Sequence, residues 1–125
     1  MPTIELSKDN FEQVVTENDT VVVDFWAPWC GPCRSFEPVF EAAAGKYPDV
    51  VFGKVNTEDQ PELAASFDIR SIPTLMVVRE KVILFSQAGA LPGSALDSVV
   101  EKALALDMQQ VHRDIAAGDA GPEQG

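Results

Sequence analysis

The sequence predicts an α/β protein with one mixed sheet and helices on both of its faces. Short runs of β-branched and aromatic residues alternate with segments of helical periodicity, in the order β-α-β-α-β-α-β-β-α. Strands separated by helices require parallel crossovers, whereas the short link between the last two strands indicates an antiparallel hairpin. One mixed sheet between two layers of helices satisfies both requirements.

The expected strands are short apolar runs bounded by polar or turn residues. They span Thr3–Leu6, Thr20–Phe25, Val50–Val55, Thr74–Val78 and Val82–Phe85. The second run has no clean alternation of polar and apolar positions, as expected of a central strand covered on both faces. Asp24 lies inside this run, and burial there would raise the pKa of its carboxyl group. The connection from Arg79 to Lys81 lacks the glycine or asparagine usual in a hairpin.

Helices are expected where apolar residues recur every three or four positions. Ser7 is expected to cap the first helix through its side-chain oxygen. The second helix is predicted from Arg34 to Tyr47, and Pro38 inside it should produce a kink. Pro61 suits the first position of a third helix. Ser94 is expected to cap the final helix. The inward face of that helix would carry Leu96, Val99, Val100, Ala103 and Leu104.

Length and composition predict one domain followed by a polar extension. Residues 1–107 carry the alternating pattern, and 125 residues are enough for one hydrophobic core. Residues 108–125 form the extension and are expected to bury little surface. Within it, Val111–Ala117 is expected to be weakly helical and Gly118–Gly125 disordered.

The charge and the N-terminal sequence exclude several classes of partner. A formal net charge of −11 argues against nucleic acid, which requires clustered Lys and Arg. No apolar stretch approaches membrane-spanning length. The N-terminus lacks a basic start and a long apolar region, so we expect no secretory signal and a cytoplasmic location. In that reducing compartment a disulfide is more often catalytic than structural.

The only two cysteines of the chain lie in Trp29-Cys30-Gly31-Pro32-Cys33, between a predicted strand and a predicted helix. Two thiols at this spacing can close a small disulfide ring, and the positive end of the helix lowers the pKa of the first cysteine. Two cysteines are too few for a disulfide scaffold or for a structural zinc site, and the single histidine, His112, lies far along the chain. The pair therefore predicts redox chemistry and no metal.

Further segments follow the order and spacing of a known family. They are Val23–Cys33 with Pro38 in the next helix, Lys54–Asn56, Ile69–Thr74 and Gly89–Leu91. With these segments the chain resembles the thioredoxins from Ile4 to Leu106. The resemblance implies the thioredoxin fold for residues 1–107. Three features depart from the family pattern: Ser71 and Lys81, both at positions where glycine is common, and the residues after Asp107.

The resemblance implies a protein disulfide reductase and dithiol electron carrier that acts in cell redox homeostasis. Its partners would be disulfide-containing substrate proteins and a thioredoxin reductase. NADPH and FAD would act only through that reductase, with no cofactor bound to this chain. The protein would be a monomer without nucleic-acid or membrane partners.

The two cysteines are expected to have different roles. Cys30 lies nearer the preceding loop and would attack as the thiolate, whereas Cys33, one turn deeper, would resolve the mixed disulfide. The resemblance implies that Asp24 is a buried base beneath Cys33 and that Lys54 lies near Asp24 and moderates its pKa. It also implies that Pro73 is a cis-proline opposite the pair.

The resemblance also defines a rim on which substrate would bind. Gly31 and Pro32 separate the cysteines, and Pro32 limits the motion between them. The apolar rim would consist of Trp29, Ile72, Pro73, Ala88 and Gly89. Ser71 lies at the edge of this expected groove and would affect substrate preference.

Two other classes of function stay open from the sequence. The chain could be a binding module in which the thiols are incidental, although Cys30, Cys33, Asp24 and Pro73 occurring together argues against this. It could also be a disulfide oxidase or isomerase. That class would favour an export signal and a more polar insert between the cysteines, and neither is present.

Overall fold

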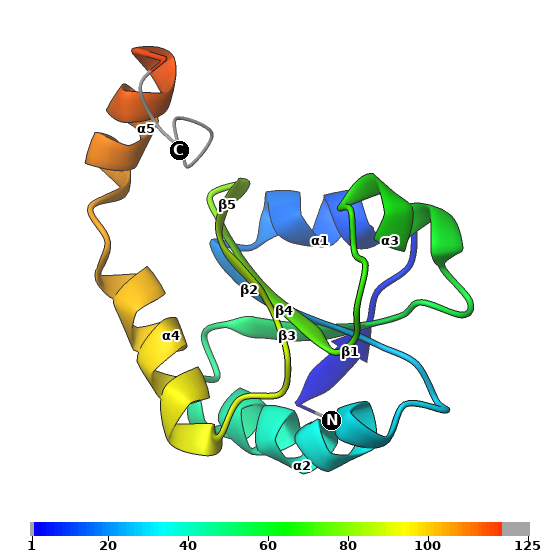
Figure 1. The fold of residues 1–125 in the computed structure, drawn as a ribbon. Coiled ribbons are helices and arrows are strands. Elements are labelled where there is room, and N and C mark those ends of the chain that lie inside the picture. The colour runs from blue at the N-terminus through cyan, green and yellow to red at the C-terminus, as the bar shows by residue number, and fades with distance from the viewer. Residues whose placement is uncertain (1, 119–125) are drawn as a thin grey trace.

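The sheet is built around β2 (Thr20–Trp26), whose first six residues are all buried. In the computed structural model, which describes residues 2–118, five strands lie in the order β1-β3-β2-β4-β5 (Figure 1). The other strands are β1 (Thr3–Glu5), β3 (Val51–Asn56), β4 (Thr74–Arg79) and β5 (Val82–Ala88). Strand β2 pairs in parallel with β3 and antiparallel with β4, which makes the sheet mixed.

Helices cover both faces of this sheet. They are α1 (Phe11–Glu17), α2 (Gly31–Lys46), α3 (Pro61–Ser66), α4 (Gly93–Ala105) and α5 (Met108–Ala116). Helices α1 and α3 lie on one face and α2 and α4 on the other (Figure 1). The predicted order of strands and helices is confirmed, and α5 follows it at the C-terminal end. Among residues 2–118, no helix is both long enough and apolar enough to cross a bilayer.

Alternate residues of β2 serve two separate parts of the core, because successive side chains of a strand point to opposite faces. Val21, Val23 and Phe25 pack on the side of α1 and α3. Val22 packs on the other side with Phe36 of α2 and further residues of α2 and α4. Asp24 falls on the same face as Val22. The central strand therefore places a carboxyl group under the helix that carries the cysteines.

Several helix starts differ from their predicted positions. Helix α2 begins at Gly31, before Arg34, because Cys30 caps it and a proline fits its first turn. Ser7 does not cap α1. Its hydroxyl oxygen accepts a hydrogen bond from the backbone N–H of Asp9 (3.2 Å), so it stabilises the turn before the helix.

Helix α4 also departs from its prediction at both ends. It begins at Gly93 with Pro92 as its N-cap, so Ser94 lies within the first turn and makes no capping bond. Leu104, which the sequence places on the inward face, is 38% exposed, because the helix ends at Ala105 beyond the edge of the core. Pro38 lies inside α2 as predicted. The kink at Pro38 stays a prediction.

The hairpin between β4 and β5 turns on two residues of left-handed backbone conformation. Glu80 has a φ of 51° and Lys81 a φ of 66°. Two-residue hairpins favour positive φ because it matches the twist of the strands, and glycine adopts it without steric cost. A lysine in this conformation costs about 1 kcal/mol. Lysine in place of the glycine common at position 81 therefore has a local steric cost in the hairpin turn, which is not part of the candidate active site.

The C-terminal extension is more ordered at its start than the sequence predicts. Asp107 caps α5 by accepting a hydrogen bond from the Gln110 N–H (3.2 Å), and Met108 is only 5% exposed. The Nε2 atom of His112 in α5 lies 2.7 Å from Oε1 of Glu80 in the hairpin, within hydrogen-bond distance. The expectation that residues 108–125 bury little surface is therefore wrong for Met108. The disorder predicted for Gly118–Gly125 falls, beyond Gly118, outside the described residues.

Replacing Met108 by alanine is expected to lower the free energy of unfolding by about 2 kcal/mol, because a buried methionine side chain is lost and its cavity remains. Urea unfolding followed by circular dichroism measures this change. Gln109→Ala, at the next and exposed position, is the matched control and should change stability by less than about 0.5 kcal/mol. Equal effects of the two substitutions would contradict a packed start of α5.

Candidate active site

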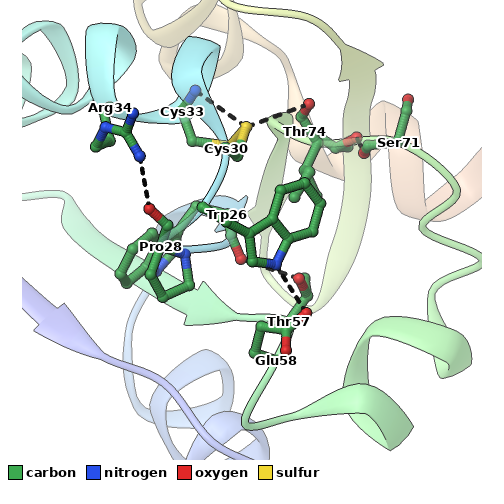
Figure 2. The surroundings of a disulfide bond; sticks show 11 residues. Trp26, Pro28, Cys30, Cys33, Arg34, Thr57, Glu58, Ser71 and Thr74 are labelled. Atoms are coloured by element: carbon green, nitrogen blue, oxygen red, sulfur yellow. Dashed lines mark hydrogen bonds between the residues drawn. A yellow bond between two sulfur atoms is a disulfide. The ribbon is translucent and has the colours of Figure 1, made fainter.

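The cysteine pair forms the first turn of α2, directly after the loop that leaves β2. Cys30 has extended backbone (φ −88°, ψ 113°) and caps the helix, since its Sγ accepts a hydrogen bond from the Cys33 N–H (3.2 Å). A disulfide joins the two residues, whose Cα atoms are 5.2 Å apart. Figure 2 shows this ring, with Arg34 reaching back to donate to the carbonyl oxygen of Pro28 (2.8 Å). The spacing thus lets one helix turn close the redox ring.

The disulfide lies against an apolar wall at the surface. Cys30 is 5% and Cys33 2% exposed, and both pack with Ala27, Trp26 and Ile72. The Sγ of Cys30 is 3.8 Å from the carbonyl oxygen of Ile72. These contacts hold the sulfur atoms in place and leave Cys30 slightly more exposed than Cys33.

The segment opposite the pair contains Pro73, and the Ile72–Pro73 bond is cis, as the resemblance implies. The end of β5 is tied to this segment. The N–H of Gly89 donates to the carbonyl oxygen of Pro73 (2.8 Å), and Ala88 pairs with Thr74 across the sheet. Gly89 has a φ of 106°, a conformation that L side chains rarely adopt. The structure therefore brings Ile72, Pro73, Ala88 and Gly89 together.

Trp29 completes the surface around the pair. Its side chain is 65% exposed, and its indole Nε1–H donates a hydrogen bond to Glu58 Oε2 (2.9 Å). Trp29, Ser71 and Ile72 are among the residues that line a surface hollow of about 210 Å³ beside the disulfide. Glu58 escaped the sequence analysis because it lies in a polar loop whose contact with Trp29 exists only in the fold.

Asp24 lies beneath this surface and is 1% exposed. Burial raises the pKa of its carboxyl group to about 7, while the positive charge of Lys54 acts to lower that pKa and the negative charge of Glu37 acts to raise it. Its Oδ1 atom is buried without a hydrogen-bond partner. A carboxyl group in this state changes protonation near neutral pH, as a proton acceptor in thiol chemistry requires.

Lys54 is the neighbour of Asp24 across the β2–β3 pairing. Its Nζ lies 2.8 Å from Glu37 Oε2 and 4.9 Å from the centroid of the Trp26 ring. Glu37 was not among the predicted site residues, although its spacing offers a signal. It follows Cys33 by four positions, which places both on one side of α2.

The described residues hold no arrangement suited to a metal. Between residues 2 and 118, no group of three or more His, Cys, Asp and Glu side chains converges on a point. His112 belongs to α5 and pairs with Glu80, not with the cysteines. The site itself holds the disulfide between Cys30 and Cys33.

Three features together define a dithiol–disulfide oxidoreductase: a disulfide within the first turn of a helix, a cis-proline whose preceding residue contacts one of its sulfur atoms, and a carboxyl group buried on the sheet face that this helix covers. The family model "Thioredoxin" matches residues 2–102. The chain belongs to the thioredoxin family.

Individual thioredoxins resemble this chain over most of its length. "Putative thioredoxin 2" of Streptomyces coelicolor is 58% identical over 118 residues, which are 94% of this chain and 88% of that protein. "Thioredoxin" of Porphyra purpurea is 44% identical over 104 residues, 82% of this chain and 97% of that protein.

Solved structures share the fold at lower identity. A mutant thioredoxin from Halobacterium salinarum superposes with a TM-score of 0.77 at 29% identity, covering 83% of this chain and 91% of that chain. Mitochondrial thioredoxin 3 of Saccharomyces cerevisiae, in its oxidised form, has a TM-score of 0.74 at 28% identity, covering 80% of this chain and 94% of that chain. The protein is thus a protein-disulfide oxidoreductase with the thioredoxin fold and a dithiol redox pair at Cys30 and Cys33. Its family implies disulfide-containing substrates and a reductase as partner.

Replacing Asp24 by asparagine is expected to stabilise the protein, and by more as the pH rises. The folded state holds the Asp24 proton up to a pKa of about 7, whereas the unfolded chain loses it near the ordinary aspartate pKa of 3.8. The wild type therefore loses stability as the pH rises from about 4 to about 7, and the asparagine variant does not. The difference in free energy of unfolding between the asparagine variant and the wild type should grow by roughly 4 kcal/mol over this range and stay constant above it.

Urea unfolding at a series of pH values measures this gap. Asp49→Asn removes one carboxyl group at an exposed position and is the matched control for net charge. A gap that is the same at pH 4 and pH 8 would show that Asp24 does not carry a raised pKa in the folded protein.

Proposed function

We propose that this chain is a general reductant of protein disulfides, with Cys30 as the nucleophile, Cys33 as the resolving thiol and Asp24 as the base. The observation that carries the proposal is a redox pair in the first turn of α2, the helix that packs on the face of the central strand where a buried carboxyl group titrates near neutral pH. The reaction needs one exposed sulfur that attacks and one deeper sulfur that loses its proton at the right moment.

In the first step the reduced chain attacks a substrate disulfide. The Cys30 thiolate forms a bond to one substrate sulfur, the substrate S–S bond breaks, and the other substrate sulfur leaves as a thiolate that takes a proton. The product is a mixed disulfide. The cap position of Cys30 favours its thiolate, because backbone N–H groups of the first turn, that of Cys33 among them, point at its Sγ.

In the second step the mixed disulfide is resolved. The Asp24 carboxylate accepts the proton of the Cys33 thiol, and the Cys33 thiolate attacks Cys30 Sγ. The bond from Cys30 to the substrate breaks, and the second substrate sulfur leaves and takes up a proton. Two electrons have moved from the dithiol to the substrate, and the chain ends as the Cys30–Cys33 disulfide.

The substrate is proposed to bind as an extended segment over the rim of Trp29, Ile72, Pro73, Ala88 and Gly89. Free backbone groups beside Pro73 can pair with such a segment by strand addition. Gly31 has open space around its Cα, so a substrate backbone can come close to the disulfide there. Pro32 restricts the loop between the sulfur atoms, and Lys54 acts on the charge of Asp24.

The cycle closes when a reductase returns the disulfide to the dithiol. We propose an NADPH-dependent thioredoxin reductase that carries FAD, so that both cofactors act outside this chain. The chain would work as a monomer in the cytoplasm, which is a reducing compartment. NADPH consumption with a cognate reductase and insulin as the disulfide substrate tests this cycle.

Two single substitutions test the division of labour between the cysteines. Cys30→Ser should abolish insulin reduction and form no mixed disulfides at this site, because an alcohol at its ordinary pKa cannot replace a thiolate. Cys33→Ser should also lose turnover, but it should accumulate substrate proteins as covalent adducts. These adducts are seen on a non-reducing gel and are released by dithiothreitol.

The double Cys→Ser variant is the matched control and should neither reduce nor trap. Trapping by Cys30→Ser, with none by Cys33→Ser, would mean that the two roles are reversed. Insulin reduction by both single variants would remove the redox role of the pair and would favour a binding module.

A further inference from the structure

The ion pair between Lys54 and Glu37 lies beside the buried carboxyl group of Asp24. The Lys54 side chain is only 13% exposed, and its Nζ is 2.8 Å from Glu37 Oε2. The ring of Trp26 lies below the same ammonium group at 4.9 Å. Carboxylate and ring together restrain a side chain that would otherwise be flexible.

The Asp24 carboxyl group is not restrained by comparable contacts. Its Oδ1 atom has no hydrogen-bond partner, although Lys54 is its direct neighbour across the β2–β3 pairing. The ammonium group of Lys54 could turn toward this oxygen, but the structure shows it paired with Glu37. Two carboxyl groups, one buried and one 52% exposed, therefore compete for a single cation.

We propose that Glu37 is a positioning residue, which holds the Lys54 ammonium group on the α2 side and so limits how far Lys54 stabilises the Asp24 carboxylate. Glu37 does not touch the reacting sulfur atoms. It acts through Lys54 on Asp24, and its effect on the reaction rests on the proposed role of Asp24 as the base.

The groups that face Asp24 come from three elements. Strand β3 contributes Lys54, and α2, whose first turn carries the redox cysteines, contributes Glu37. On the side of β4, the paired residue is Leu75, which is uncharged. Lys54 acts to lower the pKa of Asp24 and Glu37 acts to raise it. Removing the charge of Glu37 should therefore lower the pKa of Asp24 for two reasons. It deletes a negative charge near the Asp24 carboxylate, and it frees the Lys54 ammonium group to approach that carboxylate.

Glu37→Gln tests the proposal by a direct titration of the Asp24 carboxyl group. Carbon-13 NMR of the carboxyl carbon, in the dithiol form, gives the midpoint without any substrate. We expect the midpoint to fall by at least about 0.5 pH unit. Glu41→Gln, one turn further along α2, makes the same charge change where the carboxylate accepts a hydrogen bond from Thr3 Oγ1 (2.8 Å), and it should leave the midpoint unchanged.

A second pair of variants tests whether the effect passes through Lys54. Glu37→Asp keeps the charge and should restore most of the wild-type midpoint. In a Lys54→Met background, Glu37→Gln should shift the midpoint less than it does with Lys54 present, since the cation that it frees is absent. An equal shift in both backgrounds would overturn the action through Lys54.

The kinetic readout is the pH profile of mixed-disulfide release in single-turnover experiments. If Asp24 takes the Cys33 proton, Glu37→Gln should move the profile to lower pH, so that release at pH 6 becomes about threefold faster. Added salt should reduce the difference, because Glu37 is half exposed.

The two experiments separate this proposal from the proposed function. A Glu37→Gln midpoint that equals that of Glu41→Gln would overturn the role of Glu37, whatever the kinetics show. The opposite result is also distinct: Glu37→Gln could shift the Asp24 midpoint while Asp24→Asn leaves the rate of mixed-disulfide release unchanged. That result would support the control of Asp24 by Glu37 and would exclude Asp24 as the base.

Discussion

Burial of the Asp24 carboxyl group on the central strand is the constraint on which the rest of the site depends. A charged carboxylate is costly in that position, so the group holds its proton up to a pKa of about 7. The fold could relieve the cost with a direct ion pair, but Lys54 is held by Glu37 and Trp26 instead. The protein thus keeps a destabilising group that titrates where thiol exchange takes place. A cost in stability at a functional site is common in enzymes.

The helix above Asp24 supplies the other half of the chemistry. Helix α2 begins at Gly31, so Cys30 occupies the cap and Cys33 the first turn. The same local geometry orients a backbone N–H toward Cys30 and turns Cys33 toward the interior, where Asp24 lies. In the proposed mechanism the helix start favours the Cys30 thiolate, and the strand provides Asp24 as the proton acceptor for the Cys33 thiol.

The proposed substrate rim belongs to a different part of the fold. It joins the loop after β2 with the start of β4 and the end of β5, which are far apart in sequence. The hydrogen bond from Gly89 to Pro73 holds two of these segments together, and Trp29 is oriented by Glu58. We propose that this rim accepts many extended segments, because it offers mostly backbone groups and apolar surface, as a carrier of general specificity requires.

The sequence alone determined the order of the elements, the central position of β2 and the redox pair, because these follow from local patterns. An unbroken apolar run predicts a central strand, and two cysteines three positions apart can meet within one helix turn. Caps and chain ends were predicted less well. Ser7 and Ser94 compete with other residues for the cap positions, and Met108 packs although the segment after it is polar. Only the tertiary structure brought Glu37 into contact with Lys54 and Glu58 into contact with Trp29. A contact between residues so far apart in the chain leaves no periodic signal in a single sequence; it exists only once the sheet has paired and the helices have packed on it.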